Sequence, residues 1–332
     1  MQDFKKILPG LLISVLLIAV ILTRFDVKGT IESFIGASYT LLFCVFLLGF
    51  LWLFVRMLVW RTLLKDRPDK KTTFITLMEG YLLNNVLPFR MGEIGRAALL
   101  SQKTEIKFVE ALSTILIERI TDLAFSALIL IAAVPFIRGA GDAGQVGGIV
   151  MGLVLIFFVM IFFSIRYQQK ILALLRSVLA KYPKALAMAN DLIEKLLLGL
   201  DIFSDPKVFF RFIFWMTLNW GIAVFQYFLL VKAFFPQAQV VWGMFALGAA
   251  AFGGAIPSLP GGVGTLEGAM AGALVLLTTD YSASLAVPLF SRLINYFYSA
   301  LFGLYGLSTE GRSLKGLYQS LRNINSEKNS QQ

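Results

Sequence analysis

Long apolar stretches separated by short polar segments make up most of the 332-residue chain. Six of them are long enough to cross a membrane as a helix, at residues 7–23, 37–60, 108–137, 149–165, 208–235 and 283–307. Two further apolar stretches, residues 74–100 and 240–278, are interrupted by proline and glycine. The pattern predicts an all-α polytopic membrane protein with about six full transmembrane helices, two broken-helix hairpins and a short loop at residues 24–32.

The first interrupted stretch contains the segment Tyr81–Leu100, YLLNNVLPFRMGEIGRAALL, whose polar and charged residues an ordinary span would not tolerate. Pro88 lacks a backbone N–H and disfavours helix at the residue before it, so we expect a break there and a second helix opening near Gly92. The first arm, residues 74–86, would be about 20 Å long at ~1.5 Å per residue, too short for a hydrocarbon core of about 30 Å. The segment is therefore predicted to enter the membrane, turn and leave on the same side.

The second interruption, PSLPGGVGTLE at residues 257–267, combines prolines with glycines that allow positive φ and close backbone approach. The backbone positions that we expect to form this break are Pro257, Pro260, Gly261, Gly262 and Gly264. Its flanks, residues 244–255 and 265–277, are apolar and rich in small residues, which suits tight helix packing. A simple extracellular loop is the alternative, and the short flanks favour a second re-entrant hairpin.

The order of span, span, hairpin and span occurs twice, over about residues 7–137 and 149–307, with opposite orientation in the membrane. The motif L-P-x-x-x-G at residues 87–92 recurs 172 residues later at residues 259–264. Both features indicate an inverted-topology repeat, a fold in which the two breaks lie near the membrane midplane and form the binding site.

The composition supports a membrane protein, because 58% of the residues are hydrophobic and 15% charged, with a mean hydropathy of +0.76. We expect a single membrane domain over residues 1–311, an amphipathic segment along the cytoplasmic interface at about residues 166–207, and a polar cytoplasmic tail at residues 312–332. The net charge of +10 lies largely in short loops beside apolar runs, which fits the positive-inside rule better than nucleic-acid binding. Both termini are thereby expected in the cytoplasm, with the first apolar run an uncleaved anchor.

Several kinds of chemistry are excluded because the chain lacks the residues that they need. Cys44 is the single cysteine and no histidine is present, so intrachain disulfides and imidazole chemistry are ruled out. The glycine-rich GGVGTLEG lacks the lysine of a phosphate-binding loop. We therefore expect no cofactor and no metal site.

The first candidate site comprises Asn84, Asn85, Arg90, Glu93 and Arg96 around the first break. Glu93 and Arg96 are three apart and can face each other on a helix. A solvated ion pair in a cytoplasmic loop is the simpler interpretation. The functional one is a guanidinium at the tip of the hairpin that binds a lipid phosphate through two parallel hydrogen bonds, supported by N–H donors of a helix opening near Gly92.

The second candidate cluster comprises Glu118, Arg119 and Asp122 within the long run at residues 108–137. Glu118 and Asp122 share a helix face, and Arg119 lies beside that face. The cluster can hold this helix against the first hairpin, serve transport, or do both. Arg292, in the last span, needs a carboxylate partner, for which Glu267 and Asp122 are candidates; a side chain reaching to the interface is the alternative.

The segments NNVLPFRMGEIGRAALL, ERITDL, IPSLPGGVGTLEG and the segment around Arg292 together resemble the membrane-embedded flippase region of lysylphosphatidylglycerol synthases. That family includes stand-alone homologues and relatives attached to lipid-linked glycosyltransferases. The resemblance implies movement of a lipid between leaflets along the polar hairpins. The positions that match the motifs of the family, and that the resemblance implies to be functional, are Asn85, Pro88, Arg90, Gly92, Glu93, Arg96, Glu118, Arg119, Asp122, Pro260, Gly261, Gly262, Gly264, Glu267 and Arg292. The chain departs from the full synthase in ending at Gln332 without an aminoacyl-transferase domain, so we expect that it does not make lysylphosphatidylglycerol by itself.

These observations lead us to expect a non-enzymatic translocator of a phospholipid or polyprenyl-linked lipid in the bacterial cytoplasmic membrane. In this hypothesis the phosphate is held by Arg90, Arg96 and Arg292. The carboxylates that orient these arginines or exchange protons are Glu93, Glu118, Asp122 and Glu267. The alternatives are a membrane subunit that docks a lipid-modifying glycosyltransferase or synthase, and an intramembrane lipid transferase. The sequence leaves open the identity of the lipid, the energy coupling and the oligomeric state.

Overall fold

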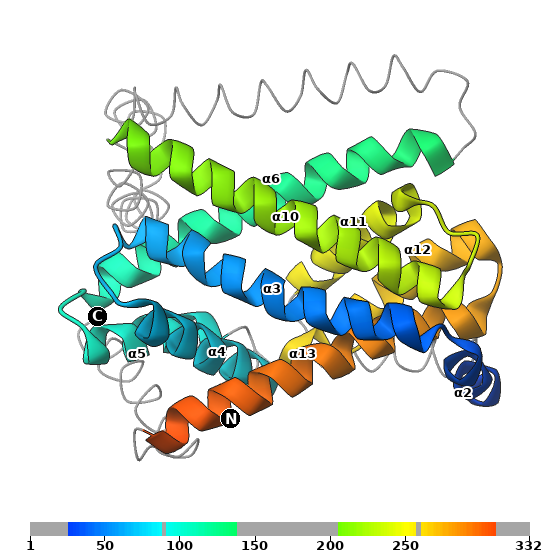
Figure 1. Cartoon of the computed structure of the whole chain (residues 1–332), viewed down its shortest axis with the longest axis horizontal. Coiled ribbons are helices and arrows are strands. Elements are labelled where there is room, and N and C mark those ends of the chain that lie inside the picture. The colour runs from blue at the N-terminus through cyan, green and yellow to red at the C-terminus, as the bar shows by residue number, and fades with distance from the viewer. Residues whose placement is uncertain (1–25, 88–90, 138–204, 257–259, 310–332) are drawn as a thin grey trace, which may run out of the picture.

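The computed structural model describes residues 26–87, 91–137, 205–256 and 260–309, and these residues form helices with no strand among them (Figure 1). Several predicted features lie outside the described residues, namely the spans at 7–23 and 149–165, most of the amphipathic segment 166–207, the tail 312–332, and Pro88, Arg90 and Pro257.

The helices described are, in chain order, α2 (Val27–Gly36), α3 (Tyr39–Leu63), α4 (Lys70–Val86), α5 (Met91–Lys103), α6 (Phe108–Ile137), α10 (Pro206–Phe234), α11 (Val240–Ala255), α12 (Thr265–Thr278) and α13 (Tyr281–Thr309), with the short 3-10 turn η3 (Pro260–Gly262). Within the described ranges, α3, α10 and α13 are long and apolar enough to cross a membrane. The 30-residue α6 is as long, but it carries the Glu118–Asp122 cluster. The all-α polytopic fold predicted from the hydrophobic pattern is thus confirmed.

One helix lies where a loop was expected, and another begins earlier than the apolar pattern indicated. Residues 24–32 were expected to form a loop, but α2 starts at Val27 because the Asp26 carboxylate accepts hydrogen bonds from the backbone N–H groups of Lys28 and Gly29 at 2.9 and 3.0 Å. Helix α4 starts at Lys70, ahead of the expected Phe74, because Asp69 caps it in the same way. Capping side chains, and not hydrophobic periodicity, therefore set these two helix starts.

Helices α3 and α10 lie side by side and antiparallel (Figure 1). Three hydrogen bonds join them at seven-residue steps, from Ser38 N–H to the Ala233 carbonyl (2.9 Å), from the Gln226 amide to the Val45 carbonyl (3.0 Å) and from the Asn219 amide to the Trp52 carbonyl (3.1 Å). Because two of these donors are side-chain amides in an apolar environment, each bond satisfies a group that would be costly to bury alone. These bonds hold the two long helices in one register.

The two short helix pairs, α4 with α5 and α11 with α12, each fold back on themselves and pack against the long helix that follows, α6 and α13 respectively. Each pair also packs against the long helix of the other half of the chain, since α4 contacts α13 and α11 contacts α6. The first break and the second are neighbours, because α4 also contacts η3. The predicted breaks after Val86 and Ala255 are therefore confirmed as the ends of packed helices.

Close approach within the first pair depends on Gly92. A methyl group added there would meet the Gly80 carbonyl oxygen and lie 2.5 Å from the Asn84 backbone nitrogen. Contacts with backbone cannot relax as contacts with flexible side chains do, so only glycine fits this position.

We predict that Gly92→Ala lowers the unfolding temperature of the protein in detergent, because overpacking of this kind costs about 1–3 kcal/mol. The matched control is Gly272→Ala in α12, where nothing lies within 4 Å of the added Cβ. The control is expected to keep or raise the unfolding temperature, since alanine favours helix. Equal effects of the two substitutions would contradict the close packing of α4 and α5.

Candidate functional site

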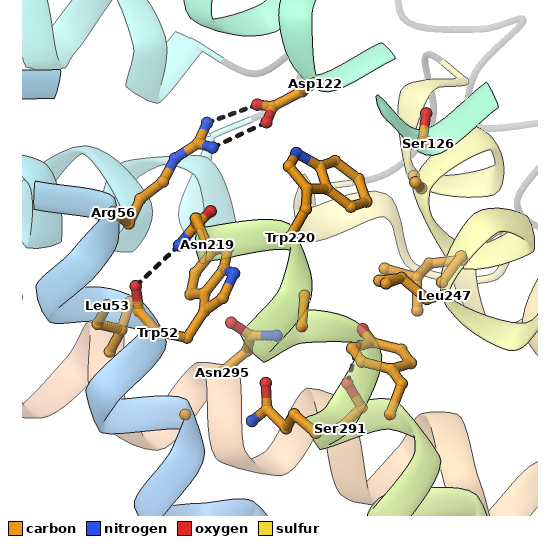
Figure 2. Close-up of a pocket in the computed structure, with 18 of the residues that line it drawn as sticks. Trp52, Leu53, Arg56, Asp122, Ser126, Asn219, Trp220, Leu247, Ser291 and Asn295 are labelled. Carbon is orange, nitrogen blue, oxygen red and sulfur yellow. Dashed lines mark hydrogen bonds and ion pairs between the residues drawn. The ribbon is translucent and has the colours of Figure 1, made fainter. Parts of the chain in front are cut away.

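A cavity of about 540 Å³ lies in the centre of the helices and is lined by residues from α3, α4, α5, α6, α10, α11, α12 and α13. Both broken hairpins contribute to it, through Glu93 in α5 and Ala255 in α11 among others. Figure 2 shows a charged pair, Arg56 and Asp122, at one end of the cavity, with Ser291 and Asn295 toward the other.

Arg56 of α3 is the central residue of the charged end, although its side chain is only 2% exposed. Its Nη1 donates to Asp122 at 2.8 Å, and its Nη2 donates to Asp122 at 2.5 Å and to Glu118 at 2.6 Å. Glu118 and Asp122 are one turn apart on α6 and share a face, as their spacing predicted, and both face Arg56. The forked contact with Asp122 is the strong bidentate form of an arginine–carboxylate pair.

Sequence reasoning missed Arg56. The available signal was its position as an arginine in the middle of the apolar run FLWLFVRMLVW, because ionisable residues inside a span indicate a functional or paired site.

Arg96 of α5 is also buried, and it donates to both carboxylate oxygens of Glu118 at 3.2 and 3.3 Å. Its guanidinium carbon lies 4.1 Å from the ring centre of Trp60, which places the cation against the aromatic face. The indole of Trp60 in turn donates to Thr114 of α6 at 3.0 Å. Arg96 is not among the described residues that line the cavity, so here it connects α5, α6 and α3.

Arg119 of α6 lines the cavity and bonds to three carboxylates, Glu93 at 3.0 Å, Glu118 at 3.3 Å and Asp122 at 3.2 Å. The expected pairing of Glu93 with Arg96 is therefore corrected, because Arg96 turns to Glu118 and Glu93 reaches Arg119. In the part of the chain that the structure describes, the cluster joins three guanidinium groups with three carboxylates. No group of acidic or cysteine side chains among the described residues is placed to hold a metal ion.

Arg292 of α13 forms a second, separate site at the second break. It pairs with Glu267, and its Nη1 and Nη2 donate to the carbonyl oxygens of Gly261 at 2.8 Å and Gly262 at 3.1 Å. Glu267 also accepts from the N–H of Gly264 at 2.9 Å, which caps the start of α12. The three glycines have φ of 71°, 70° and 88°, values that other residues rarely adopt.

Of the two partners suggested for Arg292, Glu267 is confirmed. The Arg292 side chain is 12% exposed and is held by the turn, so it does not extend to the interface. Like Arg96, Arg292 is absent from the described lining of the cavity.

The two asparagines before the first break have packing roles here. Asn85 donates to Ser299 of α13 at 2.7 Å, and its side-chain oxygen would lie 3.5 Å from a Cβ at Gly261. Asn84 lies against Gly92. Neither residue is among the described lining of the cavity, so they connect the first break to α13, to the second break and to α5.

The two Glu–Arg pairs occupy matching places in the two halves of the chain. Glu93 is the third residue of α5 and Glu267 is the third residue of α12. Arg119 is the twelfth residue of α6 and Arg292 is the twelfth residue of α13. In each half, therefore, the second helix of the broken hairpin is linked to the following long helix at the same point.

Comparison with known proteins gives a consistent result. The family model of the lysylphosphatidylglycerol synthase transmembrane region matches residues 7–303. The chain is 29% identical over 227 residues to the UPF0104 membrane protein MJ1078 of Methanocaldococcus jannaschii, an alignment that covers 67% of this chain and 91% of the relative. No solved structure matches the chain.

We predict that Arg56→Met lowers the free energy of unfolding by about 3 kcal/mol. This value is the lower limit of the cost usual for breaking a buried ion pair, because Arg119 still pairs with Asp122. Adding Asp122→Asn should recover part of this loss, since it removes the carboxylate left without its main partner. Thermal unfolding of the single and double variants in detergent measures the coupling. Simple addition of the two single effects would show that the pair does not stabilise the fold.

Proposed function

Because the chain belongs to the family of the lysylphosphatidylglycerol synthase transmembrane region, we propose that it moves a phosphate-bearing lipid between the leaflets of the cytoplasmic membrane. The observation that carries the proposal is the central cavity, which has an arginine-rich end and is lined by both broken hairpins. Charged groups in a membrane interior are costly, and they are typical of substrate pathways.

Arg56 and Arg119 are the guanidinium groups in this proposal that contact the phosphate. Both line the cavity, and both already bind carboxylates through geometry that a phosphate oxygen can reproduce. A lipid phosphate would compete with Asp122 and Glu93 for these arginines. This assignment moves the phosphate contact away from Arg96 and Arg292, which hold the surrounding helices in place.

The arrangement of the helices supports an inverted-topology repeat with two re-entrant hairpins. The reciprocal packing of each hairpin on the long helix of the other half, the antiparallel α3–α10 pair and the matched Glu–Arg pairs all follow from such a repeat. In these folds the substrate is exposed to each side in turn, as one repeat moves against the other. The cavity reaches the Glu93–Arg119 pair and not the Glu267–Arg292 pair, so the two pairs are proposed to close opposite sides. We propose from the positive-inside rule that both termini lie in the cytoplasm.

We predict that liposomes containing only this protein exchange a fluorescent phospholipid or polyprenyl-phosphate analogue between leaflets, as measured by dithionite quenching. Arg119→Lys should slow exchange roughly tenfold or more, because lysine keeps the charge but loses the planar two-point contact with phosphate. The matched control is Arg67→Lys, in an exposed pair with Glu110, which should leave exchange unchanged.

Equal exchange by the Arg119 variant and the wild type would contradict the phosphate contact. If no lipid is exchanged, with or without a pH gradient, the alternative of a subunit that docks a lipid-modifying enzyme becomes the better explanation. Chemical conversion of the labelled lipid by the purified protein would instead favour an intramembrane transferase.

A further inference from the structure

The central cavity has two chemically different parts. The charged residues among its described lining, Arg56, Glu93, Arg119 and Asp122, belong to one cluster of interlocking ion pairs. The rest of the described lining is uncharged and combines carboxamides, hydroxyl groups and aromatic rings with aliphatic side chains. A ligand that fits this cavity therefore has its charge at one end and an uncharged polar part beyond it.

Three carboxamides line the cavity, Asn219 near the charged end and Gln226 and Asn295 farther from it. Asn219 and Gln226 each use one N–H group to bind a carbonyl of α3, which leaves the amide oxygen and the second N–H of each. Asn295, whose side chain is exposed, lines the cavity and makes no hydrogen bond to any residue that the structure describes. Figure 2 shows it beside α10 on the same side of the cavity as Ser291.

Carboxamides both donate and accept hydrogen bonds, and this property matches a hydroxyl group, which does the same. A carboxylate is the strongest partner for an ammonium group on a ligand. The carboxylates of the described lining, Glu93 and Asp122, are both held by arginines at the other end. The uncharged part of the cavity thus suits hydroxyl groups better than a second charge.

Trp220 adds a donor at the charged end. Its indole nitrogen is buried without an acceptor among the described residues, while its ring stacks on Phe125 at 6.1 Å. Figure 2 shows the indole nitrogen on the side where Arg56 and Asp122 meet. A buried donor without an acceptor is costly, so a ligand oxygen at this point would be favourable.

We infer that the transported lipid is a phosphodiester whose headgroup beyond the phosphate is an uncharged polyol, such as glycerol, inositol or a sugar. Its phosphate lies between Arg56, Arg119 and the indole N–H of Trp220, and its hydroxyl groups contact Gln226 and Asn295. From Trp220 to Gln226 the rise along α10 is about 9 Å at ~1.5 Å per residue, so one small headgroup can reach both parts. This inference rests on the proposed lipid translocation and specifies its substrate.

The test compares leaflet exchange of fluorescent lipids that share the same acyl chains in liposomes containing the full chain. Phosphatidylglycerol and phosphatidylinositol carry polyols, whereas phosphatidylethanolamine and phosphatidylserine carry an ammonium group. We expect the polyol lipids to exchange at least about tenfold faster, because a site built for hydroxyl groups leaves polar atoms unpaired with the wrong headgroup.

Asn295→Leu is the sharper variant, because Asn295 makes no described hydrogen bond that folding would lose. It should slow the polyol lipids roughly tenfold and leave the slow ammonium lipids unchanged, which is the effect of about one lost hydrogen bond in a preorganised site. Gln226→Leu should act in the same direction. The matched control is Gln237→Leu, which removes an exposed amide between α10 and α11 and should change neither class.

An unchanged preference in Asn295→Leu, or equal exchange of the two lipid classes by the wild type, would overturn the polyol inference and leave lipid translocation standing. Absence of exchange for every lipid would overturn both. Loss of the preference in Asn295→Leu but not in Gln237→Leu supports the assignment.

Discussion

The forked contact of Arg56 with the carboxylates of α6 is the interaction on which the centre of this molecule depends. A guanidinium group buried among apolar helices is tolerated only when opposite charges satisfy it, and Glu118 and Asp122 do so from one helix face. Arg96 and Arg119 approach the same carboxylates from α5 and from α6 itself. The contact therefore holds α3, α5 and α6 together at the depth where the cavity lies.

In the second half of the chain, Arg292 is bound by backbone carbonyl groups as well as by a carboxylate. At the turn, the carbonyl oxygens of Gly261 and Gly262 both accept hydrogen bonds from Arg292, which also pairs with Glu267. In the first half the central residues form an ion-pair network around Arg56. In the second half they form a glycine turn whose carbonyl groups bind Arg292. The cavity extends from the network, so the two halves are matched in their framework but unequal in what they offer a ligand.

As a result, the cavity has a charged end and an uncharged end. The arginines that line the cavity pair with carboxylates, which in the proposed function give way to a lipid phosphate, while the amides on α10 and α13 are proposed to bind the neutral headgroup. Two of the three arginines that the sequence analysis placed on the phosphate, Arg96 and Arg292, are instead engaged with Trp60 and with the glycine turn, and the third, Arg90, lies outside the described residues. In the proposed function, different arginines therefore support the fold and contact the ligand.

The sequence by itself determined the helical membrane fold, the two breaks, the shared face of Glu118 and Asp122, and Glu267 as one of two partners for Arg292. These features depend on local periodicity, proline and glycine, which act within a few residues. Only the tertiary structure decided which arginines enter the cavity and which carboxylates they meet. Arg56 lies 62 residues from Glu118, and Glu93 turns from its neighbour Arg96 to Arg119 because the packing of α5 on α6 sets their rotation. Periodicity defines the faces of one helix, whereas the contact between faces depends on how helices distant in sequence pack.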